Sequence, residues 1–239
     1  MMWNPPTRWL ASQLNKLTTL VPPPPRASDD TSPRNVLLVH VHPCKTSFSS
    51  AIADAVEHGA REGGHSVKRR SLCQEGFQSA MSETERLSYF GEDGTRFPST
   101  VQREHLADLR WCDSVVFVYP TWWFNVPATL KGYFDRIFVP GSDGAWDFPR
   151  GKDVVASNGL SPRLTNIERV LGVSTYGASR HIVALAGDNG RNMIGTAIRA
   201  NFAPDCTVAW LGLYEMDFAG LEKRKDFLEN VKTFVRDKF

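Results

Sequence analysis

From residue 34 onward, strand-like runs alternate with segments whose apolar residues recur at helical spacing. Four apolar runs cover residues 35–41, 114–119, 167–175 and 207–213, and residues 65–72 form a more polar strand with Val67 and Leu72 facing inward. Helical spacing marks residues 48–62, 102–111, 127–137 and 220–239, and a turn at 187–192 leads into a helix that ends near residue 202. Ser82 and Glu85 fit a capping box for a further short helix. Five strands alternating with helices predict an α/β domain with a five-stranded parallel sheet and helices on both faces.

The stretch from residue 114 to 137 reads as strand, aromatic turn and helix. Pro120 ends the strand because it cannot donate to a ladder, and Pro127 suits the first turn of the helix. Between them lie Trp122, Trp123 and Phe124, where turns are normally polar. Ligands of open α/β sheets bind at the carboxyl ends of strands, so three rings there indicate a flat, conjugated ligand. Packing under a loop or in a subunit interface is the alternative.

A second candidate site follows the first predicted strand. The hydroxyls of Thr46, Ser47 and Ser49 cluster where the free amides of the next helix favour an anion, and Lys45 adds positive charge. The stretch lacks the GxxxxGK[ST] pattern, so it is not a nucleoside-triphosphate loop. Taken alone, Thr46 or Ser47 can equally be a helix N-cap.

The two turns together resemble the NAD(P)H:quinone oxidoreductase family, whose members are flavodoxin-like flavoenzymes. The residues that carry the resemblance are His42-x-x-x-Thr46-Ser47-Phe48 and Tyr119-Pro120-x-x-Trp123-Phe124-x-x-Pro127-Ala128-x-Leu130-Lys131-Gly132, then Asp135-Arg136 and Phe138. The resemblance implies an enzyme that transfers a hydride from NAD(P)H through bound flavin to a quinone in two steps. It also implies FAD (alternatively FMN) and a homodimer with its site at the subunit interface. Asp135 and Arg136 are interpreted as a structural pair on the helix surface.

The resemblance assigns the site residues by position. It places the flavin phosphates and ribityl chain on the first turn, the ring on the second and the pyrimidine edge on a third turn after residue 173. Trp123, Phe124 and His181 are the candidate catalytic residues. Trp146 and Phe148 are the candidates for stacking on substrate; the alternative is that these two rings bury their loop against the body of the protein. The implied cofactor-binding residues are His42, Thr46, Ser47, Phe48, Ser49, Pro120, Thr121, Trp122, Trp123, Phe124, Ser174, Thr175, Tyr176 and Gly177.

The chain departs from the family pattern at four positions. Trp122 replaces a glutamine that is common in the animal enzymes, and Tyr176 replaces a glycine. Ile182 and Asp188 stand, by simple counting, where those enzymes carry a tyrosine and a histidine that support hydride transfer. His181 or Arg180 is therefore the candidate source of positive charge near reduced flavin. These departures keep open another function, that of a flavin-binding accessory subunit that regulates a membrane transporter.

Composition limits the other classes. A net charge of +2 gives no reason to expect a nucleic-acid partner, no apolar run approaches membrane-spanning length, and four scattered cysteines show no metal-binding spacing. The cysteines are interpreted as reduced thiols of a cytoplasmic protein. Residues 1–33 are interpreted as an N-terminal extension and linker before a flavodoxin-like domain at 34–239; an acid-poor amphipathic pattern before the prolines leaves open a mitochondrial targeting segment or a tail without targeting.

Overall fold

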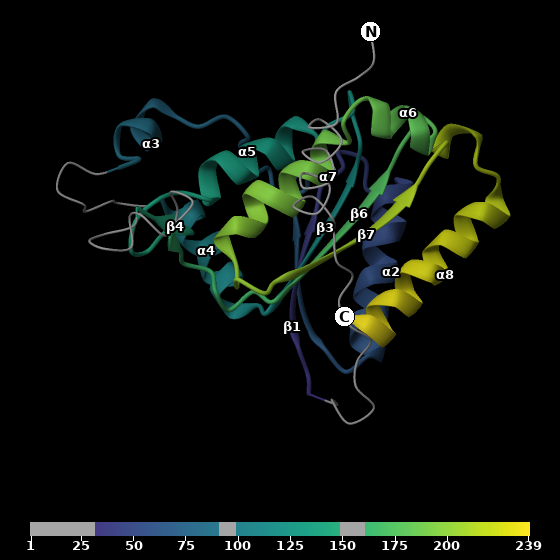
Figure 1. The fold of residues 1–239 in the computed structure, drawn as a ribbon, viewed down its shortest axis with the longest axis horizontal. Helices are drawn as coiled ribbons and strands as arrows, with labels where there is room; N and C mark the ends of the chain where they lie inside the picture. The colour runs from purple at the N-terminus through teal and green to yellow at the C-terminus, as the bar shows by residue number, and fades with distance from the viewer. Residues whose placement is uncertain (1–31, 91–98, 149–160) are drawn as a thin grey trace, which may run out of the picture.

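The structure, a computed structural model, describes residues 32–90, 99–148 and 161–239, so the predicted extension lies almost wholly outside the described residues. At the centre is a five-stranded parallel sheet in the order β2-β1-β3-β6-β7 (Figure 1). This order confirms the predicted sheet. The strands are β1 (Asn35–His40), β2 (Ser66–Ser71), β3 (Ser114–Pro120), β6 (Arg169–Thr175) and β7 (Thr207–Leu213).

Helices cover both faces of the sheet, as the alternating pattern predicts (Figure 1). One face packs against α2 (Phe48–Glu62) and α8 (Leu221–Lys238), and the other against α4 (Thr100–Trp111), α5 (Ala128–Ile137) and the segment that follows α7 (Asn189–Met193). That segment continues as a π-helix, η2 (Ile194–Ile198), and a 3-10 helix, η3 (Arg199–Asn201). The smaller elements are α3 (Glu83–Leu87), β4 (Trp146–Asp147), β5 (Ser161–Pro162), α6 (Arg180–Leu185) and η4 (Met216–Phe218).

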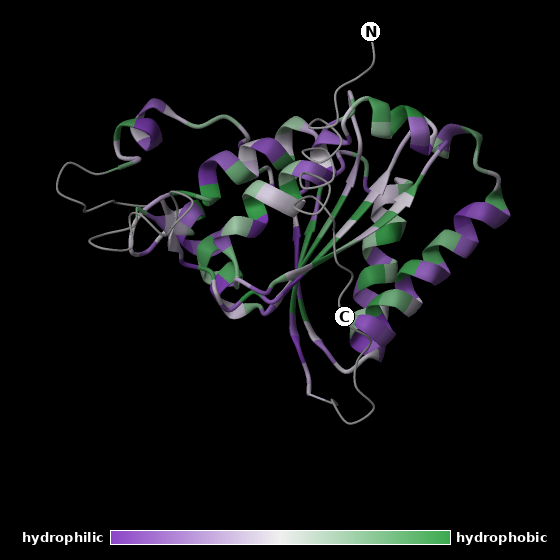
Figure 2. Cartoon of the chain, in the orientation of Figure 1, coloured by the Kyte–Doolittle hydropathy of each residue, from purple (hydrophilic) through white to green (hydrophobic). Residues whose placement is uncertain are grey.

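The core follows from side-chain alternation in the buried strands. In β1, Val36 and Leu38 face α2 and α8, while Leu37 and Val39 face α4 and α5. Every residue of β3 and β6 is buried, because both of their faces are covered by helices. Figure 2 shows the apolar strands at the centre and polar positions on the outer helix surfaces. This arrangement leaves the turns at the strand ends as the places where function can be carried.

Local predictions agree with the structure except at a few places. The capping box of Ser82 and Glu85 is confirmed at the start of α3. Pro127 is the N-cap residue of α5, one position before the predicted helical turn. The prediction of Arg136 as a helix-surface residue is wrong, since it is only 7% exposed. The short helix α6 and the β4–β5 pair were not predicted, because neither is long enough to show a periodic pattern.

Candidate functional site

Three turns meet at the carboxyl edge of the sheet, after β1, β3 and β6. The strands β1 and β3 are neighbours, as are β3 and β6. The ring of His42 lies 6.2 Å from that of Trp122, centroid to centroid, which joins the first turn to the second. The Thr121 amide donates to the Thr175 carbonyl at 2.8 Å, which joins the second turn to the third. The sheet order therefore brings the three predicted motifs together.

The turn after β3 is tight and strained. The amide of Trp122 donates to the carbonyl of Asn125, and the amide of Asn125 returns a bond to the carbonyl of Trp122, both at 3.0 Å. The two central residues, Trp123 and Phe124, have φ of 50° and 56°, as a type I′ turn requires. A left-handed conformation costs a non-glycine residue roughly 1–2 kcal/mol. Such strain is held by the surrounding structure and is concentrated at functional sites.

This turn offers hydrogen-bond donors to a ligand. Within the described residues, the amides of Trp123 and Phe124 donate to no protein acceptor. The Phe124 carbonyl accepts a bond from the Asn189 side chain at 3.2 Å, which ties the turn to α7. The Trp123 ring is 96% exposed. Free amides beside an exposed ring suit a flat ligand with acceptor atoms on its edge.

A cavity of about 300 Å³ lies between the second and third turns. Its volume is at the small end of the range for ligand pockets, about 300–1,000 Å³. It is large enough for a planar ring system, and a longer ligand would extend beyond it. The residues that line it are Thr121, Trp123, Phe124, Tyr176, Gly177, Ala178 and Val183.

The turn after β1 opens the N-terminus of α2. Ser47 is the N-cap residue, and its hydroxyl accepts from the Ser50 amide at 3.1 Å, so the simpler interpretation of Ser47 is confirmed. In the described part of the chain, the amides of Phe48 and Ser49 and the buried Ser49 hydroxyl lack a protein partner. The Phe48 ring packs against Phe227 of α8, with ring centroids 6.5 Å apart. The helix end and the free donors suit an anion such as a phosphate.

Behind the cavity, polar side chains form a connected network. The Trp210 indole donates to the Tyr176 hydroxyl at 2.9 Å, and that hydroxyl donates to the Asp188 carboxylate at 3.2 Å. The Tyr176 ring stacks on Tyr214 with centroids 4.5 Å apart. Burial raises the pKa of the Tyr176 hydroxyl far above neutral pH and also raises the pKa of Asp188. The family resemblance named Tyr176 as a cofactor-binding position that departs from the pattern and Asp188 only as a departure; Trp210 and Tyr214 were missed.

Some predicted site residues brace the turns and do not face the cavity. Ser174 is fully buried, and its hydroxyl donates to the Tyr119 carbonyl at 2.9 Å and bonds the Thr121 hydroxyl at 2.8 Å. Pro120 is buried as the last residue of β3. His181 is exposed on α6, where its ring lies 3.2 Å from the Ser179 hydroxyl and does not line the cavity. Val183 of the same helix does line it and was missed.

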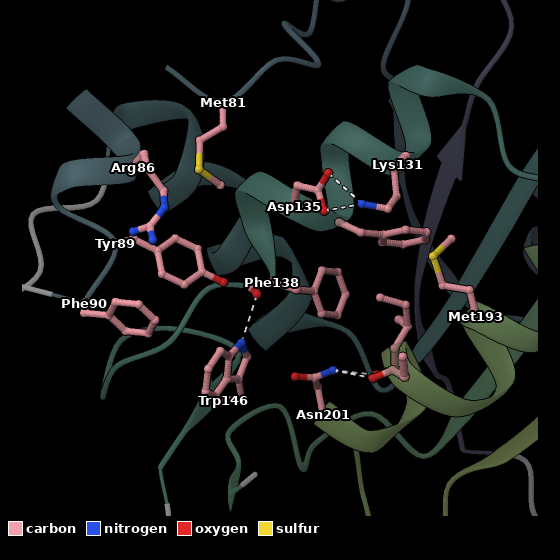
Figure 3. A pocket seen from close by; sticks show the side chains of 13 residues that line it. Met81, Arg86, Tyr89, Phe90, Lys131, Asp135, Phe138, Trp146, Met193 and Asn201 are labelled. Atoms are coloured by element: carbon pink, nitrogen blue, oxygen red, sulfur yellow. Dashed lines mark hydrogen bonds and ion pairs between the residues drawn. The ribbon is translucent and has the colours of Figure 1, made fainter. Parts of the chain in front are cut away.

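Trp146 lines a second cavity, of about 470 Å³ (Figure 3). Phe148 is not one of its lining residues, but its ring packs against Phe90 and Trp146, which are. The Trp146 indole donates to the Phe138 carbonyl at 3.0 Å, and the Phe148 ring lies 5.3 Å from the Trp146 ring. Arg86, Tyr89 and Phe90, the Lys131–Asp135 ion pair of α5, and Met193 with Asn201 surround the cavity (Figure 3). The two cavities share no lining residue. Within one chain, therefore, the predicted substrate-stacking rings do not cover the 300 Å³ cavity.

The model of a known protein family, described as flavodoxin-like fold, matches residues 34–219. The chain belongs to the flavodoxin-like fold family. Its sheet order is also the one expected of flavodoxin-like sheets, in which the ligand lies at the β1/β3 crossover. Family membership confirms the fold class, and the three turns described above occupy the ligand-binding edge of that fold.

Several curated proteins are similar to part of this chain. The chain is 36% identical over 108 residues to an uncharacterized NAD(P)H oxidoreductase of Haemophilus influenzae, covering 45% of this chain and 52% of that protein. It is 30% identical over 123 residues to NAD(P)H dehydrogenase [quinone] 1 of Rattus norvegicus, covering 45% and 44%. The match thus spans about half the length of these curated relatives. The structure of an NAD(P)H:quinone oxidoreductase from Methanothermobacter marburgensis superposes with a TM-score of 0.68 at 22% identity, covering 86% of this chain and 96% of that one.

Proposed function

We propose that this protein is a flavin-dependent NAD(P)H oxidoreductase that passes a hydride from NAD(P)H through bound flavin to a quinone or similar acceptor. The observation that carries the proposal is the 300 Å³ cavity between the turns after β3 and β6, with the free amides of Trp123 and Phe124 and the exposed Trp123 ring on one wall. The names of the relatives from Haemophilus influenzae and Rattus norvegicus support the same reaction class. Side chains alone perform hydride transfer poorly, whereas flavin supplies this chemistry when bound.

The donors of the site fit a flavin in two parts. The amides of Trp123 and Phe124 suit the acceptor atoms of the ring, while the amides of Phe48 and Ser49 suit its phosphate. The buried Ser49 hydroxyl is a polar atom without a partner at the same helix end. The contact between the His42 and Trp122 rings joins the turn that carries the Phe48 and Ser49 amides to the turn that carries the Trp123 and Phe124 amides. We assign FAD as the flavin, with FMN as the alternative.

The protein's own contribution is binding and orientation. The strained turn fixes the Trp123 and Phe124 amides before a ligand arrives, so little ordering entropy is lost on binding. The exposed Trp123 ring offers a stacking surface at the cavity mouth, where nicotinamide and quinone would bind in turn. His181 lies on the exposed side of α6 and is kept as the candidate for positive charge at this mouth.

A homodimer with its site at the subunit interface belongs to the same proposal. Trp123 is 96% exposed and Leu185 of α6 is 84% exposed, and large apolar surfaces of this kind are often covered by a partner. Trp146 and Phe148, which do not face their own chain's cavity, would then face that of the second subunit. A monomer in analytical ultracentrifugation of the flavin-loaded protein would overturn this part.

Among the residues that the structure describes, none of the helices has the length and apolar character needed to span a membrane.

The first test is the absorbance spectrum of the purified protein, with any chromophore released and identified. We expect a flavin spectrum that NAD(P)H bleaches and a quinone restores, and the released compound distinguishes FAD from FMN. Absence of flavin, together with failure to bind either flavin on addition, would overturn the proposal.

A pair of variants tests the location. Ala178→Trp places a large ring among the residues that line the cavity and is expected to weaken flavin binding at least tenfold. Ala184→Trp makes the same change on the exposed side of α6, outside the cavity lining, and is expected to bind flavin as the wild type does. Equal binding by both variants would place the flavin elsewhere. Circular dichroism checks that each variant is folded.

A further inference from the structure

The network behind the cavity contains a carboxylate with an unusual backbone. Asp188 precedes α7 and has φ of 40° and ψ of 53°, the left-handed region, which favours glycine and is strained for other residues. An aspartate at an N-cap normally accepts a bond from its own helix, yet Asp188 makes no such bond. Its carboxylate accepts instead from the Tyr176 hydroxyl. The strained backbone thus directs a negative charge toward the cavity wall.

Three hydrogen bonds link Asp188 and its neighbour Asn189 to residues that line the cavity. Tyr176 lines the cavity and donates to the Asp188 carboxylate at 3.2 Å. The amide of Asp188 donates at 3.0 Å to the carbonyl of Val183, which also lines the cavity. The side-chain amide of the next residue, Asn189, donates at 3.2 Å to the carbonyl of Phe124, another residue that lines the cavity. A ligand in the cavity is therefore separated from the carboxylate by one layer of side chains.

We propose that Asp188, acting through Tyr176, takes up a proton when the flavin in the 300 Å³ cavity is reduced. This inference rests on the proposed function, since it needs flavin at that place. It assigns Asp188 a positioning and charge-compensating role without direct contact with the flavin. Tyr176 is the connecting group, because its hydroxyl is held by Trp210 on one side and by Asp188 on the other.

The charges around Asp188 favour this role. Burial raises the pKa of Asp188, and this effect outweighs the opposing Tyr176 hydrogen bond and the positive charge of Arg191. The neighbouring tyrosines stay neutral near pH 7, because burial raises the pKa of each of them. The titratable and charged groups that act on Asp188 or on its tyrosine partners are Tyr119 at the end of β3, Tyr176 after β6, Tyr214 after β7, Arg180 on α6 and Arg191 on α7.

The proton and electron balance is simple. Hydride delivery from NAD(P)H adds two electrons and one proton to the bound group, so the cavity gains one negative charge. That charge raises the proton affinity of the nearby carboxylate, by on the order of tenfold for charges separated by one side-chain layer. Asp188, which is half-buried, takes one proton from solvent and becomes neutral. When the acceptor removes the hydride, the proton returns to solvent. By linkage, protonation of Asp188 favours reduction to the same extent.

The test is the pH dependence of the flavin midpoint potential, measured by spectroelectrochemistry on the flavin-loaded full chain. Each proton taken up with two electrons contributes about 30 mV per pH unit to the slope. A tenfold change in proton affinity gives an uptake of about half a proton at the middle of the pH window between the two pKa values of Asp188, so we expect the wild-type slope to be steeper there than that of Asp188→Asn by about 15 mV per pH unit. The asparagine still accepts from Tyr176 but cannot titrate. Tyr176→Phe keeps the Asp188 carboxylate but removes the hydroxyl that donates to it. Because that hydrogen bond lowers the pKa of Asp188, the pH window of steeper slope should move to higher pH in this variant.

Asp217→Asn is the matched control. Asp217 is exposed and lies beside the same turn, since a Cβ on Gly177 would come within 2.9 Å of its Oδ2 atom. We expect this variant to keep the wild-type slope. Carbon-13 NMR of the aspartate carboxyl groups gives a direct reading: the Asp188 titration should move upward by about one pH unit or more when the loaded protein is reduced.

The outcomes separate this inference from the proposed function. A protein that binds flavin and is bleached by NAD(P)H, yet shows the same slope in the wild type and Asp188→Asn, overturns the role of Asp188 and leaves the proposed function standing. A slope that changes equally in Asp217→Asn also overturns it. A protein that binds no flavin overturns both.

Discussion

Helix α5 carries two ion pairs of equal length that differ in burial, and they allow a matched test of what holds the fold. Nη2 of Arg136 lies 2.6 Å from Oε1 of Glu85, and both side chains are 9% exposed. Nζ of Lys131 lies 2.6 Å from Oδ1 of Asp135, and these side chains are 53% and 47% exposed. We predict that Arg136→Met destabilises the protein far more than Lys131→Met does.

The magnitude follows from burial. Removing one partner of a buried pair leaves the other charge without compensation and costs about 3–5 kcal/mol. Arg136→Met also removes a hydrogen bond to the Gln78 carbonyl and the packing of the guanidinium on the Phe77 ring, 5.0 Å away. An exposed pair four residues apart on a helix contributes about 0.3–0.5 kcal/mol. In a chain of this size, each 1 kcal/mol shifts Tm by about 2–4 °C.

Thermal unfolding followed by circular dichroism measures the difference. We expect Arg136→Met to lower Tm by about 6–20 °C and Lys131→Met by less than about 2 °C. Equal losses in the two variants would refute the reasoning from burial.

The pH dependence of stability in acid gives a second check. Burial alone would raise the pKa of Glu85, but the bonds from Arg136 and Ser82 outweigh it and lower that pKa. The ion pair's contribution to the unfolding free energy is therefore fully present above pH 4.5, the usual pKa of this carboxyl, and is lost as the pH falls through the lowered pKa. The difference in Tm between the wild type and Arg136→Met should therefore narrow in acid.

Three further predictions concern other parts of the chain. Gly132→Ala should destabilise the fold by about 1–3 kcal/mol in urea unfolding despite better helix propensity, because the new Cβ would lie 2.1 Å from the Ser79 carbonyl oxygen; a stabilised variant would contradict this. Burial lowers the pKa of His40 to about 4, so the unfolded chain takes up a proton first as the pH falls. The unfolding free energy should therefore fall by up to about 3 kcal/mol between pH 6.5 and 4. His40→Leu should flatten this pH profile, and an unchanged profile would argue against a role of His40. Iodoacetamide should label the exposed Cys44 in the folded protein, whereas Cys112, whose pKa is raised by burial, should react only after unfolding, as mass spectrometry can show.

Much of the fold is readable from local patterns. The apolar runs locate β1, β3, β6 and β7 to within about two residues, and helical periodicity locates α2, α4, α5 and α8. Parallel strands buried on both sides need apolar residues throughout, so their composition alone reveals them. The rings of Trp122, Trp123 and Phe124 stand out because a turn rarely carries them. The family motifs then indicate which strand ends carry the candidate site.

Only the tertiary structure decided which of those residues face the cavity and what lies behind them. Glu85 and Arg136 are 51 residues apart in sequence, and Tyr176 is 12 residues from Asp188 and 34 from Trp210, so no local period records these contacts. The left-handed backbone of Trp123, Phe124 and Asp188 is equally hidden, because sequence preference favours glycine there and distant contacts override it. Sequence by itself determined the strands, the helices and the candidate turns, since these depend on near neighbours. The cavity, the buried ion pair and the Asp188 network depend on chain segments that only folding brings together.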